Sequence, residues 1–197
     1  MTTVLNLDAL TRSLTREQFV GLCQSNPDLQ LERSRQGELI IVSPVGGESG
    51  NREATLITKV GIWNEQTQLG YVFSSSTIFS LPEGGVGEAS SESFRSPDVA
   101  WVAKPRWQAL SPAERESFPP ICPDFVIELR SRSDRLQPLQ AKMQEYLDSG
   151  LRLGWLINPQ DQQVEIYRPN QAVELVQLPA TLSGEAVLPG FELALAK

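Results

Sequence analysis

The sequence predicts a mixed α/β fold in which one sheet carries flanking helices. Two stretches, about 52–66 and from Pro138 to Ser149, place apolar residues at helical spacing. Short apolar runs rich in strand-forming residues, above all 123–130 and 153–157, lie between and after these helices. This order of elements is typical of a sheet with helices packed on it. With 197 residues, 40% of them hydrophobic, we expect one domain over residues 1–197 with a full core.

The N-terminal part is expected to add a helix and a β-hairpin to that sheet. Thr15 is a suitable N-cap for a short amphipathic helix that stops at 26–28. Residues 29–33 alternate like a strand, and a turn at Gln36-Gly37 leads into a second strand over 38–44. The glycine-rich loop that follows lacks the lysine and the spacing of a phosphate-binding loop, so we expect it only to lead into the helix at 52–66.

The middle of the chain is expected to form a long hairpin. Residues 70–73 begin a strand that 77–81 continue, and a polar loop over 82–93, expected to be mobile, joins it to a second strand over 95–102. A helical turn is expected near 110–115. The strands expected after the second flanking helix are 153–157, 164–167, 173–176 and 191–195.

The composition excludes several classes of enzyme. The chain has no histidine, so Ser-His-Asp triads, Cys-His mechanisms and HExxH zinc sites are unavailable; carboxylates, lysines and hard cations remain. A formal net charge of −7 argues against a protein that coats nucleic acid by bulk electrostatics, although a local basic groove is compatible with it. Cys23 and Cys122 are isolated, as expected of buried free thiols in a reducing cytosol. Neither a signal-peptide layout nor a membrane-spanning stretch is present, so we expect a cytoplasmic protein.

A carboxylate interrupts the most apolar of the predicted strands. Glu128 lies within the run 125–129, which is typical of a strand buried on both faces, where an unpaired carboxylate is costly. Asp124 is about 13 Å away along the same strand, too far to share a cation whose ligands lie at about 2.0–2.6 Å. Asp98 lies near the start of another strand, and paired strands are about 4.8 Å apart. We therefore predict that Asp98 and Glu128 meet, and that Asp124 is a strand-entry residue.

The same residues resemble the signature of a nuclease superfamily. Pro97-Asp98 followed by Glu128-Leu129-Arg130 is similar to the PD-(D/E)XK pattern, with arginine in place of the usual lysine. A longer series resembles the Uma-type family of restriction-endonuclease-like proteins over nearly the whole chain; its stretches are 37–44, 95–102, 123–131, 142–146, 154–159 and 188–191. The resemblance implies a restriction-endonuclease-like core, a mixed β-sheet flanked by helices, with the N-terminal helix and β-hairpin as an extension.

The resemblance also implies roles for individual residues. Asp98 and Glu128 would bind Mg²⁺ (or Mn²⁺), and Glu32, which resembles the family's acidic residue before the first hairpin, would add a ligand directly or through water. The family's lysine has moved to the following helix, which matches Lys142 and would let it orient or deprotonate the attacking water. Arg130 stays protonated and cannot act as a base, but its guanidinium can grip a phosphate and stabilise the charge of the transition state.

Each of these assignments has an ordinary alternative. Glu32 lies on an alternating strand, where a solvated outer face is common. Lys142 could be a surface lysine whose aliphatic stem lies on apolar surface. The two paired carboxylates could instead form structural ion pairs with Arg95 or Arg130.

The predicted activity is Mg²⁺-dependent endonucleolytic hydrolysis of DNA phosphodiester bonds, that of a metal-dependent deoxyribonuclease. A basic segment directly after the candidate ligand supports a nucleic-acid partner; it contains Arg130, Arg132, Arg135 and Lys142 against Asp134. Related nucleases often pair to cut two strands, so a homodimer is one option.

Two other functional classes compete with this prediction. The first is a catalytically inactive nuclease-fold module for binding or assembly, which the acidic net charge and the missing strand lysine favour. The second is a two-carboxylate glycosidase, which also needs no histidine but requires aromatic sugar platforms. Trp101 lies close to Asp98 in the sequence, but we expect it in the core.

Overall fold

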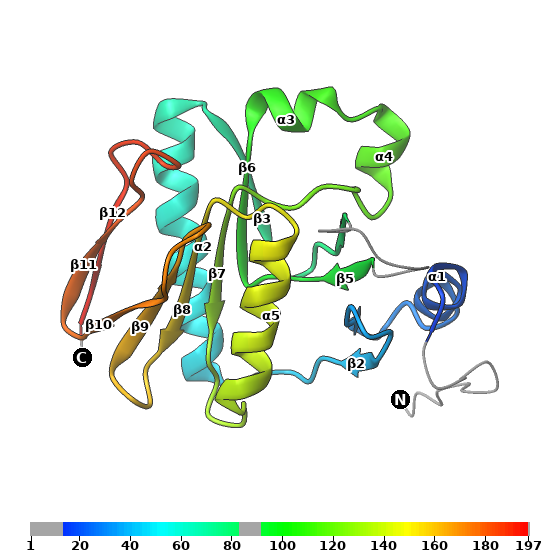
Figure 1. Cartoon of the computed structure of the whole chain (residues 1–197), viewed down its shortest axis with the longest axis horizontal. Coiled ribbons are helices and arrows are strands. Elements are labelled where there is room, and N and C mark those ends of the chain that lie inside the picture. The colour runs from blue at the N-terminus through cyan, green and yellow to red at the C-terminus, as the bar shows by residue number, and fades with distance from the viewer. Residues whose placement is uncertain (1–13, 83–91, 197) are drawn as a thin grey trace.

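The computed structural model describes residues 14–82 and 92–196 (Figure 1). Within these residues the strands form a six-stranded main sheet, a four-stranded second sheet and a two-stranded hairpin. The main sheet has the order β10 (Glu174–Gln177), β9 (Gln163–Tyr167), β8 (Leu153–Asn158), β7 (Phe125–Leu129), β6 (Val99–Ala103) and β3 (Gly70–Ser74). The predicted mixed α/β fold with helices flanking one sheet is confirmed.

The main sheet is mixed because one of its strand pairs is parallel. β7 and β8 run in the same direction, whereas the other neighbouring pairs are antiparallel. Parallel neighbours require a crossover, and helix α5 (Leu136–Asp148) supplies it. This connection places α5 beside the two central strands that it joins (Figure 1).

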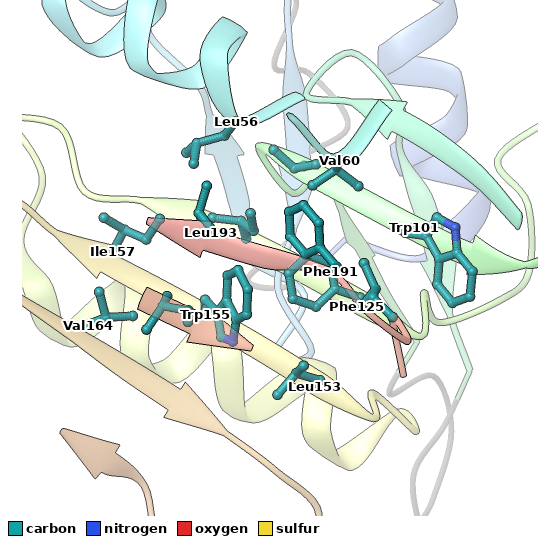
Figure 2. Packing of buried hydrophobic residues seen from close by; sticks show 14 of the residues in the cluster. Leu56, Val60, Trp101, Phe125, Leu153, Trp155, Ile157, Val164, Phe191 and Leu193 are labelled. Atoms are coloured by element: carbon teal, nitrogen blue, oxygen red, sulfur yellow. The ribbon is translucent and has the colours of Figure 1, made fainter. Parts of the chain in front are cut away.

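The two faces of the main sheet have different covers. Along β7, Phe125, Ile127 and Leu129 belong to an apolar cluster with helix α2 (Gly47–Thr67) and the C-terminal hairpin of β11 (Ala180–Ser183) and β12 (Glu192–Leu195). Figure 2 shows this cluster, with Leu56 and Val60 of α2 and Phe191 and Leu193 near β12 facing the strands. Val126 belongs to the opposite cluster, under α5. Since side chains alternate along a strand, Glu128 also faces α5.

The second sheet carries the predicted N-terminal extension. Its order is β2 (Leu39–Ile41), β1 (Leu31–Arg33), β5 (Ser93–Arg95) and β4 (Phe79–Leu81), and its pairs are antiparallel. Helix α1 (Arg16–Ser25) packs on it through Phe19 and Leu22. Thr15 caps this helix as predicted, in a capping box with Gln18.

Two of the predicted strands are wrong, because each crosses from one sheet to the other. Residues 95–102 divide into β5 in the second sheet and β6 in the main sheet, separated by Ser96-Pro97-Asp98. Pro97 has no N–H for a ladder, and the Ser96 N–H donates to a side chain. Residues 70–81 divide likewise into β3 and β4, with a turn closed by Thr77 N–H and the Ser74 carbonyl. These two crossings bring the edge of the second sheet against the main sheet.

The remaining differences are smaller. α2 begins at Gly47, with extended Gly46 as its N-cap, rather than near residue 52. Two short helices, α3 (Lys104–Ala109) and α4 (Pro112–Glu116), follow β6, the second of them at the predicted helical turn. β4 and β5 pair as the predicted long hairpin, but most of the loop between them lies outside the described residues. Among the helices of residues 14–82 and 92–196, none is long and apolar enough to cross a membrane.

Candidate active site

Asp98, directly before β6, lies beside Glu128 of the neighbouring strand β7. β6 and β7 pair with Val99 opposite Ile127, and the same register continued by one residue sets Asp98 opposite Glu128. The Asp98 Oδ2 atom accepts a hydrogen bond of 2.6 Å from the backbone N–H of Leu129. The strand pairing that selected Asp98 as the neighbour of Glu128 is therefore confirmed.

Lys142 of α5 reaches into this pair from above the sheet. Its Nζ lies 2.9 Å from Oε1 of Glu128 and donates to Oε2 of the same carboxylate at 3.1 Å. It also donates to Oε1 of Glu32 and to the Ser96 carbonyl, both at 2.9 Å. The residue is only 9% exposed. The alternative of a surface lysine is therefore wrong, because the side chain points into the protein.

Glu32 of β1 is buried at the same place, so the alternative of a solvated outer-face position is wrong as well. The residue is 3% exposed. Oε1 accepts from Lys142 and from the backbone N–H of Ser96, and Oε2 accepts from Nη1 of Arg95 at 3.0 Å. The structure thus brings Glu32, Asp98, Glu128 and Lys142 together, where the second sheet meets the main one.

Three further residues belong to this buried cluster, and none of them was singled out as a site residue from the sequence. Arg95 of β5 donates Nε and Nη2 to the two oxygens of Glu145, each at 2.8 Å. The Tyr146 hydroxyl donates to Oε1 of Glu128 at 3.0 Å. Glu145 and Tyr146 follow Lys142 by three and four residues on α5. That helical spacing puts them on one face and is the signal that would have found them.

Arg130 lies apart from the buried carboxylates. It directly follows β7, and its guanidinium donates to Asp161 at 3.0 Å, to Asn158 at 3.2 Å and to the Asp134 carbonyl. The alternative of structural ion pairs between the central carboxylates and an arginine is also not what the structure shows. Arg95 pairs with Glu32 and Glu145, and Arg130 pairs with Asp161.

Asp124 has the structural role that the strand geometry predicts. It lies just before β7, fully buried, and its Oδ2 accepts from the backbone N–H of Ala103 at 2.8 Å. Arg106 and Arg152 form ion pairs with its two oxygens at 3.0 and 3.3 Å. This carboxylate therefore has two cationic partners of its own.

The buried cluster around Glu128 has more negative than positive groups. Four carboxylates (Glu32, Asp98, Glu128 and Glu145) face two cationic side chains, Lys142 and Arg95. With all of them ionised, an excess of two negative charges remains. A buried net charge of this size is costly unless protons or a cation offset it.

The pKa values locate that excess at the central pair. Burial, together with the charges of Asp98 and Glu32, raises the pKa of Glu128 to about 8 against the opposing effect of Lys142. Burial likewise raises the pKa of Asp98 to about 6. By contrast, the pKa of Glu32 is lowered, because Lys142 and Arg95 together outweigh its burial. Burial alone would lower the pKa of Lys142, but Glu128 and Glu32 raise it, so the ammonium stays protonated.

The donor set suits a hard divalent cation that keeps part of its water shell. Within the part of the chain that the structure describes, no three or more His, Cys, Asp or Glu side chains are placed to hold a metal together. Asp98 and Glu128 offer carboxylate oxygens from adjacent strands, and Mg²⁺ in phosphate-processing sites is commonly bound by one or two carboxylates, waters and substrate phosphate. With Asp98 and Glu128 both ionised, the excess of two negative charges in the cluster equals the charge of one such ion. The residues present therefore fit the cation that the PD-(D/E)XK resemblance implies.

Comparisons with known proteins identify a matching family and a solved structure of similar fold. The model of the Uma2 family, described as "Putative restriction endonuclease", matches residues 16–196. A solved structure, "a putative nuclease belonging to DUF820 from Anabaena variabilis ATCC 29413", superposes with a TM-score of 0.74 at 19% sequence identity, covering 92% of this chain and 94% of that one. At this identity the likeness shows the fold. None of the curated proteins searched matches the chain.

Proposed function

The chain belongs to the Uma2 family of putative restriction endonucleases, and from that premise we propose that it is a divalent-metal-dependent endonuclease that hydrolyses DNA phosphodiester bonds. Asp98 and Glu128 would hold the cation, Mg²⁺ or Mn²⁺. The observation that carries the proposal is the placement of these two carboxylates side by side, in a cluster of four carboxylates and only two cationic side chains.

The bound cation would supply charge neutralisation at the phosphate and a lowered pKa of a water molecule. Asp98 and Glu128 would orient such an ion because both carboxylates are fixed, one by the Leu129 N–H and the other by the Tyr146 hydroxyl. Both lie at the end of β7 that leads into the basic segment after it. A phosphodiester would therefore meet the carboxylate pair and the arginines in one region.

Lys142 acts in this proposal as a hydrogen-bond donor. Its raised pKa keeps it protonated at neutral pH, so it does not serve as the base that removes a proton from water. A fixed ammonium beside the reacting phosphate orients the attacking water and stabilises the negative charge that develops in the transition state. Of the two roles predicted for Lys142, the structure favours orientation.

The arginines after β7 are proposed to contact the phosphate backbone. Arg132 and Arg135 are exposed, and contacts of this kind fix nucleic acid without reading its sequence. Arg130 already pairs with Asp161, so a phosphate would have to replace that carboxylate. We therefore assign stabilisation of the phosphate charge first to Lys142 and second to Arg130.

The test is cleavage of supercoiled plasmid and of single-stranded DNA with Mg²⁺ or Mn²⁺. Wild-type protein should nick or linearise plasmid with either metal and not in EDTA, and Asp98→Asn and Glu128→Gln should abolish this. Glu165→Gln is the matched control, because Glu165 is a buried glutamate of β9 whose partners are the neutral Gln140 and Tyr167. Metal-dependent cleavage that survives Asp98→Asn and Glu128→Gln would refute the site.

A catalytically inactive binding module remains the second candidate, and one observation favours it. Lys142 already contacts Glu128, so a cation on Glu128 would compete with an existing ammonium. An inactive module predicts no change of melting temperature with Mn²⁺. Saturable stabilisation by Mn²⁺ that Glu128→Gln abolishes would exclude it.

A further inference from the structure

The buried cluster contains a closed ring of ion pairs that begins and ends on α5. Lys142 binds Glu32, Glu32 binds Arg95, and Arg95 binds Glu145, which lies three residues after Lys142 on the same helix. The ring thus passes from α5 through β1 and β5 of the second sheet and back to α5. Sliding of α5 relative to the second sheet would stretch the ring at both ends.

The links of this ring are hydrogen-bonded ion pairs between buried side chains. The Lys142 ammonium has three protons and three acceptors, Glu32, Glu128 and the Ser96 carbonyl. Arg95 meets Glu145 with two parallel bonds of 2.8 Å, a fork that fixes orientation as well as distance. Both oxygens of Glu32 already accept from protein donors, two of which are cationic.

The ring also holds the chain that carries Asp98. Ser96 accepts from Lys142 through its carbonyl and donates its N–H to Glu32. Ser96 is two residues before Asp98, at the crossing between the sheets. Displacing Glu32 would therefore release Lys142, whereas the Leu129 N–H would still hold the Asp98 carboxylate.

From these contacts we infer that Glu32 is a positioning residue for Lys142, in place of the metal ligand predicted from the sequence, and that the Arg95–Glu145 pair holds Glu32 in position. The inference rests on the proposed function. When a cation engages Glu128, Lys142 loses one of its three anchors and keeps the other two, Glu32 and the Ser96 carbonyl. Glu32 therefore keeps the ammonium beside the reaction centre.

A double-mutant cycle separates positioning from metal binding. Glu32→Gln should lower kcat for plasmid cleavage by about 100-fold, the scale of losing one hydrogen-bond donor to the transition state, with KM little changed. Added to Lys142→Met, it should lower kcat no further, because Glu32 acts through Lys142. The Mn²⁺ affinity of folded Glu32→Gln should stay within about threefold of wild type, whereas loss of a ligand contact would weaken it by about tenfold or more. Loss of Mn²⁺ binding, or a further drop of kcat in the double variant, would overturn the inference.

Nuclear magnetic resonance of the lysine ammonium groups tests the same contact without activity. Lys142 is one of four lysines, and Lys59 and Lys104 are exposed. We expect a slowly exchanging Nζ signal from Lys142 that persists when Mg²⁺ saturates the wild-type protein. It should disappear in Glu32→Gln, weaken in Arg95→Lys and remain in the control Glu165→Gln.

The result also distinguishes this inference from the proposed function. If the wild-type protein neither cleaves DNA nor binds metal, the nuclease proposal is refuted. The ammonium signal of Lys142 would still report on its contact with Glu32. A signal that Mg²⁺ abolishes in the wild type, or that survives Glu32→Gln, would show that Glu32 does not hold Lys142.

Discussion

The two ends of β7 both carry a buried carboxylate, and the two carboxylates are treated differently. Asp124, just before the strand, has a backbone donor and two arginines, so its charge is more than offset. Glu128, near the other end, shares one lysine with Glu32 and lies beside Asp98. Burial alone therefore does not mark a site. A site is indicated by an excess of like charge that no protein group compensates, because a ligand or a proton must neutralise that charge.

The largest difference between the two ends of β7 should be in DNA cleavage when each carboxylate is replaced by an amide. Asp98→Asn and Glu128→Gln are expected to lower plasmid cleavage by at least about 100-fold, because each removes a charge that acts on the reaction centre. Asp124→Asn should keep metal-dependent cleavage in the folded fraction, as measured by gel assay at matched folded concentration. Equal losses in all three variants would erase the proposed difference.

Stabilisation of the folded protein by divalent metal should depend on Glu128 and not on Asp124. At a free Mn²⁺ concentration of 100 times its Kd, binding to the native state adds about 2.7 kcal/mol to the free energy of unfolding. Thermal melts of Asp124→Asn should show the same increment, and Glu128→Gln should show none. An increment retained in Glu128→Gln would place the metal elsewhere.

Without metal, replacing Asp124 should lower the free energy of unfolding more than replacing Glu128. Asp124→Asn leaves Arg106 and Arg152 without their carboxylate, and since both are partly exposed we expect a loss of about 2 kcal/mol in urea unfolding. Glu128→Gln removes part of an unfavourable charge and should cost less than this in EDTA. A greater loss from Glu128→Gln would mean that its contact with Lys142 outweighs the repulsion.

The pH dependence of the metal-free protein follows from Glu128. Its folded-state pKa, about 8, is above the ordinary value of 4.5, so the folded protein binds the extra proton and its stability falls as the pH rises between these values. The slope from this one group is at most about 1.4 kcal/mol per pH unit. Melting temperatures in EDTA between pH 5 and 8 should fall more steeply for wild type than for Glu128→Gln. Parallel curves would contradict the raised pKa.

Much of the core was predictable, because local patterns control it. The apolar run 125–129 predicted a buried strand, and the spacing of Leu56, Val60 and Trp63 predicted the buried face of a helix. Both are present in the structure. The two long strands of the middle region were wrong because the short polar stretches at 74–77 and 95–98, where the chain changes sheet, resemble interruptions within one strand. Polar residues mark both interruptions, but a local pattern does not tell that the segment beyond them pairs in another sheet.

By itself the sequence determined that Glu128 is an anomaly in an apolar strand and that Asp98, not Asp124, is its neighbour, since strand spacing and alternation are local geometry. The tertiary structure decided what surrounds them. Glu32 is buried by contacts more than 60 residues away in the chain, and Arg130 turns to Asp161. Partners of this kind depend on how two sheets and one helix meet, and the free energy of a buried charge depends on all of its neighbours at once.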